Sequence, residues 1–243
     1  MRLLLIRHGD PDYAADSLTA RGRREAELLA ERIAPMDISE YYVSTMGRAL
    51  ETARPTLEKA GRTAKECPWL REFDIPVHRP DCGGALSYVP WDWLPQDWLR
   101  DPILLDREHW AEHPVFAEVD LKSAYDRVIE EFEQVLARHG YVREGLLYRV
   151  TRAESDTLAF FCHFGLSCVL MSRLLNLSPM VFWHGLAMAP SSVTTIYSEE
   201  RRPGIAAFRA ASIGDVSHLY FRGQAPSFAG RFCEVYGNGD RID

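Results

Sequence analysis

This sequence has few of the features that mark secreted, membrane-spanning or zinc-binding proteins. No two of its five cysteines share a CxxC spacing, and their number is odd, so neither a disulfide framework nor a zinc site is indicated. The apolar run MRLLLI meets Arg7 at once and is too short for a signal peptide or a transmembrane helix. We therefore expect a cytoplasmic protein with no membrane partner. Its thiols should be reduced and mostly buried, at Cys67, Cys82, Cys162, Cys168 and Cys233.

Positive charge is also scarce. The chain has 28 lysines and arginines against 35 aspartates and glutamates, a formal net charge of -7, which gives no general attraction for nucleic acid or an anionic membrane. Any anion site must therefore be local. Internal repeats and low-complexity tracts are absent, and the composition, 47% hydrophobic and 26% charged, is typical of a folded globular protein. We expect a single domain over residues 1–243.

Strand-like and helix-like segments alternate in the first part of the chain. Residues 2–6 predict a strand, and residues 19–33 predict a helix with Thr19 as its N-cap. Residues 41–45 predict a second strand, which runs into a helix that Pro55 interrupts or ends.

The same alternation continues after a long amphipathic helix. That helix begins at Leu121, and Gly140 is placed to end it. Another helix is expected at 165–175, and strands are expected at 146–150, 157–163, 192–198 and 205–212. The whole pattern predicts an α/β fold, a three-layer α/β/α sandwich with a mostly parallel central sheet.

Charged and imidazole side chains follow three of the predicted strands. Arg7 and His8 come directly after the first, Arg48 follows the second, and His163 follows the later strand that contains AFFC. Because open α/β sheets bind ligands beyond the carboxyl ends of their strands, we expect these four side chains to lie close together. The alternative is that each strand has simply reached the surface.

Two guanidinium groups and two imidazoles around one small volume need an anion between them. A tetrahedral phosphate fits, because arginine donates in pairs to phosphate oxygens. A helix starting near Gly165 would direct free backbone N–H groups to the same place. One histidine can then attack phosphorus as a neutral imidazole, while the other donates to the transferring oxygens.

Several segments together resemble the histidine phosphatase superfamily (phosphoglycerate mutase-like, branch 1). They are RHG at residues 7–9, STMGRALETA, CHFG, the helix entry SLTARGRREAELLAERI, WLREFD, PSSVTTI and GDVSHL. The resemblance covers residues 1–74 and roughly 121–221.

The resemblance implies a role for each residue of the predicted cluster. His8 would be the phosphorylated nucleophile, Arg7, Arg48 and His163 would complete the phosphate pocket, and Glu72 would be the proton donor. His8, Glu72 and His163 would thus be catalytic. The implied substrate is a small-molecule phosphomonoester, with phosphate as product and with no cofactor and no metal, because positive side chains already neutralise the phosphoryl group.

Some residues depart from this scheme or stand beside it. Asp10 and Pro11 replace the Glu or Gln and the Thr that commonly follow RHG in the family, and Pro11 should stiffen the rim of the pocket. Ser44 is a candidate cap for the helix that carries Arg48, together with Thr45. His184 and His218 are expected to serve packing and structure rather than catalysis.

Residues 75–120 match no family motif and hold four of the six tryptophans, Trp91, Trp93, Trp98 and Trp110. We interpret this segment as an inserted lid over the pocket. A satellite core or a homodimer contact explains the aromatic residues equally well. Acidic residues outnumber basic ones here, so we expect a monophosphate with an apolar, aromatic or sugar-like body rather than a bisphosphate.

Three functions remain open from the sequence. The first is a metal-independent phosphomonoesterase that acts through phosphohistidine. The second is a cofactor-dependent phosphoglycerate mutase-type phosphotransferase, for which the segment lacks a basic cluster to bind a substrate carboxylate. The third is a non-catalytic module that binds a phosphorylated ligand, and the intact set of candidate residues argues against it.

Overall fold

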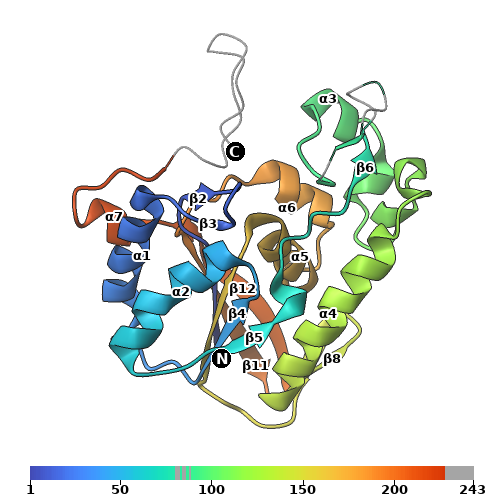
Figure 1. Cartoon of the computed structure of the whole chain (residues 1–243). Helices are drawn as coiled ribbons and strands as arrows, with labels where there is room; N and C mark the ends of the chain where they lie inside the picture. Colours follow the sequence, from blue (N-terminus) through green and yellow to red (C-terminus); the bar gives the residue numbers. More distant parts are fainter. Residues whose placement is uncertain (80–82, 84–85, 88, 228–243) are drawn as a thin grey trace.

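A single mixed sheet runs through the centre of the molecule (Figure 1). The computed structural model describes residues 1–79, 83, 86–87 and 89–227, so Cys82 and Cys233 lie outside the described residues. Within them the sheet has eight strands. In spatial order these are β5 (Lys65–Cys67), β4 (Glu40–Ser44), β10 (Thr157–Cys162), β1 (Arg2–Arg7), β11 (Val193–Arg202), β12 (Ile205–Asp215), β9 (Leu147–Val150) and β8 (Tyr141–Glu144).

The two halves of the sheet differ in strand direction. From β5 to β1 all neighbours pair in parallel, whereas from β1 to β8 all neighbours pair antiparallel. A short turn joins β11 directly to β12, with Gly204 at a φ of 83°, and a turn of this length permits only antiparallel pairing. The α/β class is therefore confirmed, but the central sheet is mixed rather than mostly parallel as predicted: three pairings of the described strands are parallel and four are antiparallel. The parallel half carries the predicted site residues.

Helices cover both faces of the sheet, which gives the predicted three layers (Figure 1). The helices α1 (Ala20–Ile33) and α2 (Gly47–Ala60) pack on one face, where Leu4 and Ile6 of β1 point. The helices α4 (Leu121–Arg138) and α5 (Phe164–Leu175) pack on the other, with α6 (Pro179–Gly185) beside α5. Alternate side chains of a strand thus enter separate cores.

Pro55 does not end α2. The helix continues to Ala60 and stops at Gly61, which has a left-handed φ of 62° that glycine adopts without strain. The prediction that Pro55 interrupts or ends the helix was wrong. Thr52, Ala53 and Thr56 are buried on both sides of the proline, and this packing offsets the loss of one helical hydrogen bond. Gly140, with a φ of 88°, does follow the end of α4 as predicted.

Residues 75–120 form short elements around buried aromatic side chains. These elements are β6 (Val77–His78), β7 (Leu86–Ser87), α3 (Pro95–Trp98) and 3-10 turns at Pro102–Leu105, Trp110–Glu112 and Pro114–Phe116. Trp93, Trp110 and Phe116 are buried and join the core cluster of α4 and α5. Burying an aromatic side chain stabilises the fold by roughly 1.5–3 kcal/mol.

Three smaller elements complete the described chain. A two-stranded hairpin of β2 (Pro11–Asp12) and β3 (Ser17–Leu18) precedes α1, a 3-10 turn at Pro68–Leu70 follows β5, and α7 (Ser217–Tyr220) packs against α1. Among the described residues, no helix combines the length and apolar character that crossing a membrane requires. Cys162 and Cys168 are buried free thiols, and Cys67 is a partly exposed one.

Candidate active site

The structure brings Arg7, His8, Arg48 and His163 together at the carboxyl ends of the parallel strands. Arg7 ends β1 and pairs in register with Cys162, so His8 and His163 are neighbours directly beyond β1 and β10. Their ring centroids are 5.2 Å apart. Arg48 comes from the first turn of α2, which follows β4. All four side chains are buried, with exposed fractions between 0% for His163 and 6% for Arg48.

The imidazole of His8 has one nitrogen free for nucleophilic attack. Its Nδ1 lies 2.7 Å from the Gly9 carbonyl, which can only accept, so Nδ1 carries the proton. Burial lowers the pKa of His8 well below its usual value, and the nearby Arg7 and Arg48 lower it further. A neutral ring protonated at Nδ1 leaves a lone pair on Nε2.

The backbone of His8 is held on three sides. Its N–H donates to the Cys162 carbonyl at 3.0 Å, and its carbonyl accepts from Ser191 N–H at 2.8 Å. The next N–H, that of Gly9, donates to Thr52 Oγ1 at 2.9 Å. These contacts from β10, the 189–192 loop and α2 fix the position of His8.

His163 is oriented by Ser44. The Nε2 atom of His163 lies 2.8 Å from Ser44 Oγ, whereas its Nδ1 has no partner among the described residues. Burial lowers the pKa of His163 well below its usual value, with His8 as the next cause. Met46 is the N-cap residue of α2, and its own side chain makes no cap hydrogen bond. The expectation that Ser44 caps α2 was therefore wrong.

The cap of α2 comes instead from Asp16, in the β2–β3 hairpin. One Asp16 oxygen accepts from the Gly47 N–H at 2.8 Å, and the other is 2.6 Å from Nη1 of Arg48. Tyr13 adds an aromatic ring 5.4 Å below the Arg48 guanidinium. Asp16 was not among the residues predicted from the sequence. Its one signal was a carboxylate three residues before the helix cap Thr19.

Arg7 is held by a backbone carbonyl and an aromatic ring. Its Nη1 donates to the Met188 carbonyl at 2.5 Å, and its guanidinium lies over the Phe164 ring at 5.9 Å. Arg7 Nε, like Arg48 Nε and His163 Nδ1, is buried without a hydrogen-bond partner among the described residues. Buried polar atoms are rarely left unpaired. These three nitrogens belong to the group of side chains around His8 and His163. They indicate a site for an anion with several acceptor oxygens.

Glu72 lies beside this group, at the start of α5. Its Oε1 accepts from the N–H groups of Phe73 at 2.9 Å and Leu166 at 3.0 Å. We expected the start of α5 to direct N–H groups to the phosphate; the Leu166 N–H holds Glu72 instead. Burial raises the pKa of Glu72, while the two N–H groups, Arg48 and Arg7 act against that rise. A raised pKa favours the protonated acid that a proton donor requires.

The unusual Asp10 anchors the loop after the nucleophile. Its carboxylate accepts from the hydroxyl groups of Thr19, at 2.7 Å, and Ser227. Its backbone N–H donates to buried Glu25 at 2.8 Å. A Cβ on Gly22 would lie 2.2 Å from the Asp10 carbonyl, so the loop packs directly on the start of α1. Asp10 therefore secures the loop and the chain near residue 227.

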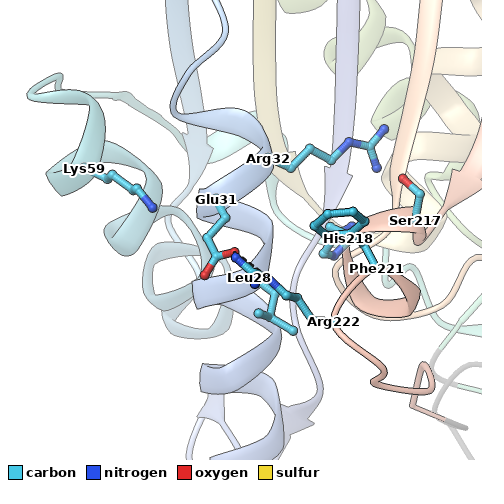
Figure 2. A pocket seen from close by; sticks show the side chains of 8 residues that line it. All are labelled: Leu28, Glu31, Arg32, Lys59, Ser217, His218, Phe221 and Arg222. Atoms are coloured by element: carbon cyan, nitrogen blue, oxygen red, sulfur yellow. Dashed lines mark hydrogen bonds and ion pairs between the residues drawn. The ribbon is translucent and has the colours of Figure 1, made fainter.

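A separate cavity of about 640 Å³ lies between α1, the end of α2 and α7 (Figure 2), and none of the predicted site residues lines it. It contains His218, whose Nε2 lies 3.1 Å from Ser191 Oγ. His184 stacks on Trp98 with ring centroids 4.9 Å apart and accepts from the Trp93 N–H. Both histidines therefore have the structural contacts that we expected. No three His, Cys, Asp or Glu side chains of the described chain gather as a metal site.

Comparison with known proteins identifies the family. The model of the histidine phosphatase superfamily (branch 1) matches residues 3–79. A protein named probable phosphoglycerate mutase GpmB, from Serratia proteamaculans, is 33% identical over 230 residues, which are 90% of this chain and 95% of that protein. The chain belongs to the histidine phosphatase superfamily. The predicted resemblance is thereby confirmed.

Other known proteins match over shorter lengths or by fold. A probable phosphatase of Schizosaccharomyces pombe is 39% identical over 67 residues, 24% of this chain and about a third of that relative's length (32%). A phosphoserine phosphatase mutant from Entamoeba histolytica, solved in complex with phosphoserine, has a TM-score of 0.60 at 17% identity. That match covers 90% of this chain and 98% of the solved chain and shows a shared fold.

Proposed function

We propose that this protein is a phosphomonoesterase that acts without a metal, through a phosphohistidine on His8. One observation carries the proposal: Arg7, Arg48 and His163 lie close to a neutral His8 that is protonated at Nδ1, and each has a buried nitrogen without a partner among the described residues. Such a group matches the oxygens of a phosphoryl group in charge and in donor number.

In the first step, Nε2 of His8 attacks phosphorus and the bond from phosphorus to the ester oxygen breaks. Glu72 gives its proton to the leaving alkoxide, which departs as an alcohol. Water then attacks the phosphohistidine, Glu72 takes a proton from it, and the P–N bond breaks to release phosphate. Arg7 and Arg48 neutralise the phosphoryl oxygens, and His163 donates to one of them through Nδ1.

The test is hydrolysis of p-nitrophenyl phosphate with EDTA present. The wild type should keep its activity in EDTA, and His8→Ala should lose it. His109→Ala is the matched control, because His109 is an exposed histidine in the 75–120 segment and should retain wild-type rates. Acid quenching with a ³²P-labelled substrate should trap an acid-labile phosphoenzyme only when His8 is present. Activity in His8→Ala would overturn the proposal.

A mutase is the second candidate, since the Serratia relative that aligns over 90% of this chain is named a probable phosphoglycerate mutase. A mutase must keep water from its phosphohistidine and return the phosphoryl group to a second hydroxyl. ³¹P NMR with 3-phosphoglycerate separates the two functions: hydrolysis yields inorganic phosphate, whereas isomerisation yields 2-phosphoglycerate. A panel with phosphoserine and an aryl phosphate extends the test to the substrate class.

A further inference from the structure

A tryptophan from the segment without family motifs reaches the proposed proton donor. The point where a Cβ on Gly165 would lie is 2.2 Å from Cη2 of Trp91 and 2.9 Å from Oε1 of Glu72. The edge of the indole and the carboxyl group therefore both lie over Gly165, at the first turn of α5. Only glycine leaves room for this contact.

Trp91 is firmly held in this place. It is 6% exposed and packs edge-on against Phe164, with ring centroids 5.9 Å apart. Its ring also lies 5.9 Å from that of Trp183, whose Nε1 donates to the Gly165 carbonyl at 3.0 Å. These aromatic rings form a wall around the start of α5, and the edge of Trp91 lies over Gly165, where the Glu72 carboxyl also lies.

Two opposing effects act on the Glu72 carboxyl group. The N–H groups of Phe73 and Leu166 favour the ionised form, as do the guanidiniums of Arg48 and Arg7. Burial favours the neutral form and outweighs them, so that the pKa of Glu72 is raised. The side chains that keep water from the Glu72 carboxyl therefore decide whether it is protonated.

Charged side chains of both signs surround Glu72. Arg71, and Arg127, Glu130 and Glu131 of α4, line the same cavity of about 620 Å³ as Glu72. Arg7 from β1 and Arg48 from α2 are cations and stabilise the carboxylate. His8 and His163 are held neutral by burial, as are the thiols of Cys162 and Cys168, whose pKa values burial raises. Burial is the largest cause of the raised pKa of Glu72, and Trp91 supplies apolar surface beside the carboxyl group over Gly165.

We propose that Trp91 is a positioning residue that keeps Glu72 in its protonated form by shielding the carboxyl group from water. The proposal rests on the role proposed for Glu72 as proton donor. It gives the 75–120 segment a part in the chemistry in addition to any part in substrate binding. A carboxylic acid made a better donor by an apolar wall is an established means of acid catalysis.

The kinetic test compares Trp91→Ala and Trp91→Phe with the wild type over pH 5–9, on an alkyl phosphate and on p-nitrophenyl phosphate. In Trp91→Ala the basic limb of kcat/KM should move to lower pH. At pH 7 the rate with the alkyl ester should fall about tenfold for each unit by which the pKa of Glu72 falls. The nitrophenyl ester, whose leaving group needs no proton, should lose less than about threefold. Trp91→Phe keeps an aromatic ring in this place, so its pH profile should stay close to that of the wild type.

Trp98→Ala is the matched control, because it removes a tryptophan of the same segment that stacks on His184 rather than facing Glu72. It should leave the pH profile unchanged. Equal losses on both substrates without a pH shift in Trp91→Ala would overturn the proposal.

A direct titration separates failure of this proposal from failure of the proposed function. The ¹³C resonance of the Glu72 carboxyl, assigned by its loss in Glu72→Gln, is followed against pH in the wild type and in Trp91→Ala. The midpoint should fall toward 4.5, the ordinary value for a glutamate, whether or not the protein hydrolyses anything. An unchanged midpoint in a folded Trp91→Ala variant would overturn the proposal.

Discussion

The proposed phosphate pocket and the 75–120 segment meet at Glu72 but are built in different ways. The pocket places four buried cationic or imidazole side chains at strand ends and at the first turn of α2, and it holds them through backbone carbonyls, Ser44 and Asp16. The described residues of the 75–120 segment form only short elements and are held by aromatic packing around Trp93, Trp110 and Phe116. Precise placement of charge needs a rigid scaffold, whereas an apolar wall needs only burial. The two regions should therefore respond differently to mutation.

The largest difference is expected for Arg48→Ala. This change removes a guanidinium that faces the phosphoryl site, and kcat/KM should fall roughly 10³-fold, which corresponds to about 4 kcal/mol of transition-state stabilisation. Removing Trp98 from the 75–120 segment should change kcat/KM less than threefold. Steady-state kinetics with p-nitrophenyl phosphate measures both. If kcat/KM falls by similar factors when Arg48 and Trp98 are removed, the two regions do not differ in the way proposed.

The histidines of the two regions should give opposite pH dependence of stability. The pKa of His163 is lowered by burial, so below about pH 6.5 the unfolded chain binds a proton that the folded chain does not. Its contribution to stability is therefore lost as the pH falls. The pKa of His109 is raised by its hydrogen bond to Asp106, so its contribution is present below pH 6.5 and lost as the pH rises.

Urea unfolding at pH 7, 6 and 5 measures these contributions against His163→Gln and His109→Ala. The wild type should lose stability relative to His163→Gln by up to about 1.4 kcal/mol per pH unit below pH 6.5. The comparison with a variant is needed because Glu25 changes the stability in the opposite sense. Burial raises the pKa of Glu25 to about 7, so its contribution to stability is lost as the pH rises from 4.5. A flat difference for His163→Gln would show that the pocket imidazole takes up its proton over the same pH range in the folded and unfolded chains, which would contradict the lowered pKa of His163.

The sequence predicted the pocket better than its surroundings, for a physical reason. Arg7, His8 and His163 directly follow buried apolar runs, and parallel strands that end at one edge of a sheet bring such residues together. Asp16 lies in a hairpin whose contact with α2 depends on tertiary packing. Trp91 lies in a segment without periodicity, so its position over Gly165 could not be read from a pattern. The antiparallel half of the sheet was obscured because strand direction depends on which strands become neighbours.

A smaller effect on kcat is expected from His218, which lies outside the pocket and lines the cavity between α1 and α7 (Figure 2). His218 lies 3.1 Å from Ser191 Oγ, and the Ser191 N–H in turn holds the His8 carbonyl. Ser191 has a left-handed φ of 59°, which a residue other than glycine keeps only when its surroundings hold it there. We expect His218→Ala to lower kcat about threefold with little change in KM.

A double-mutant cycle tests this link. Ser191→Ala should lower kcat to a similar extent, and the double variant should lose no more than either single one, because both changes break the same contact. Phe221→Ala is the control, since this residue lines the same cavity but is 83% exposed and has no contact with Ser191 among the described residues. Losses that multiply in the double variant would show that His218 supports the fold near α7 rather than the position of His8. The pKa of His218 is lowered to about 4 by burial, so the ring is neutral and the effect should be constant from pH 6 to pH 8.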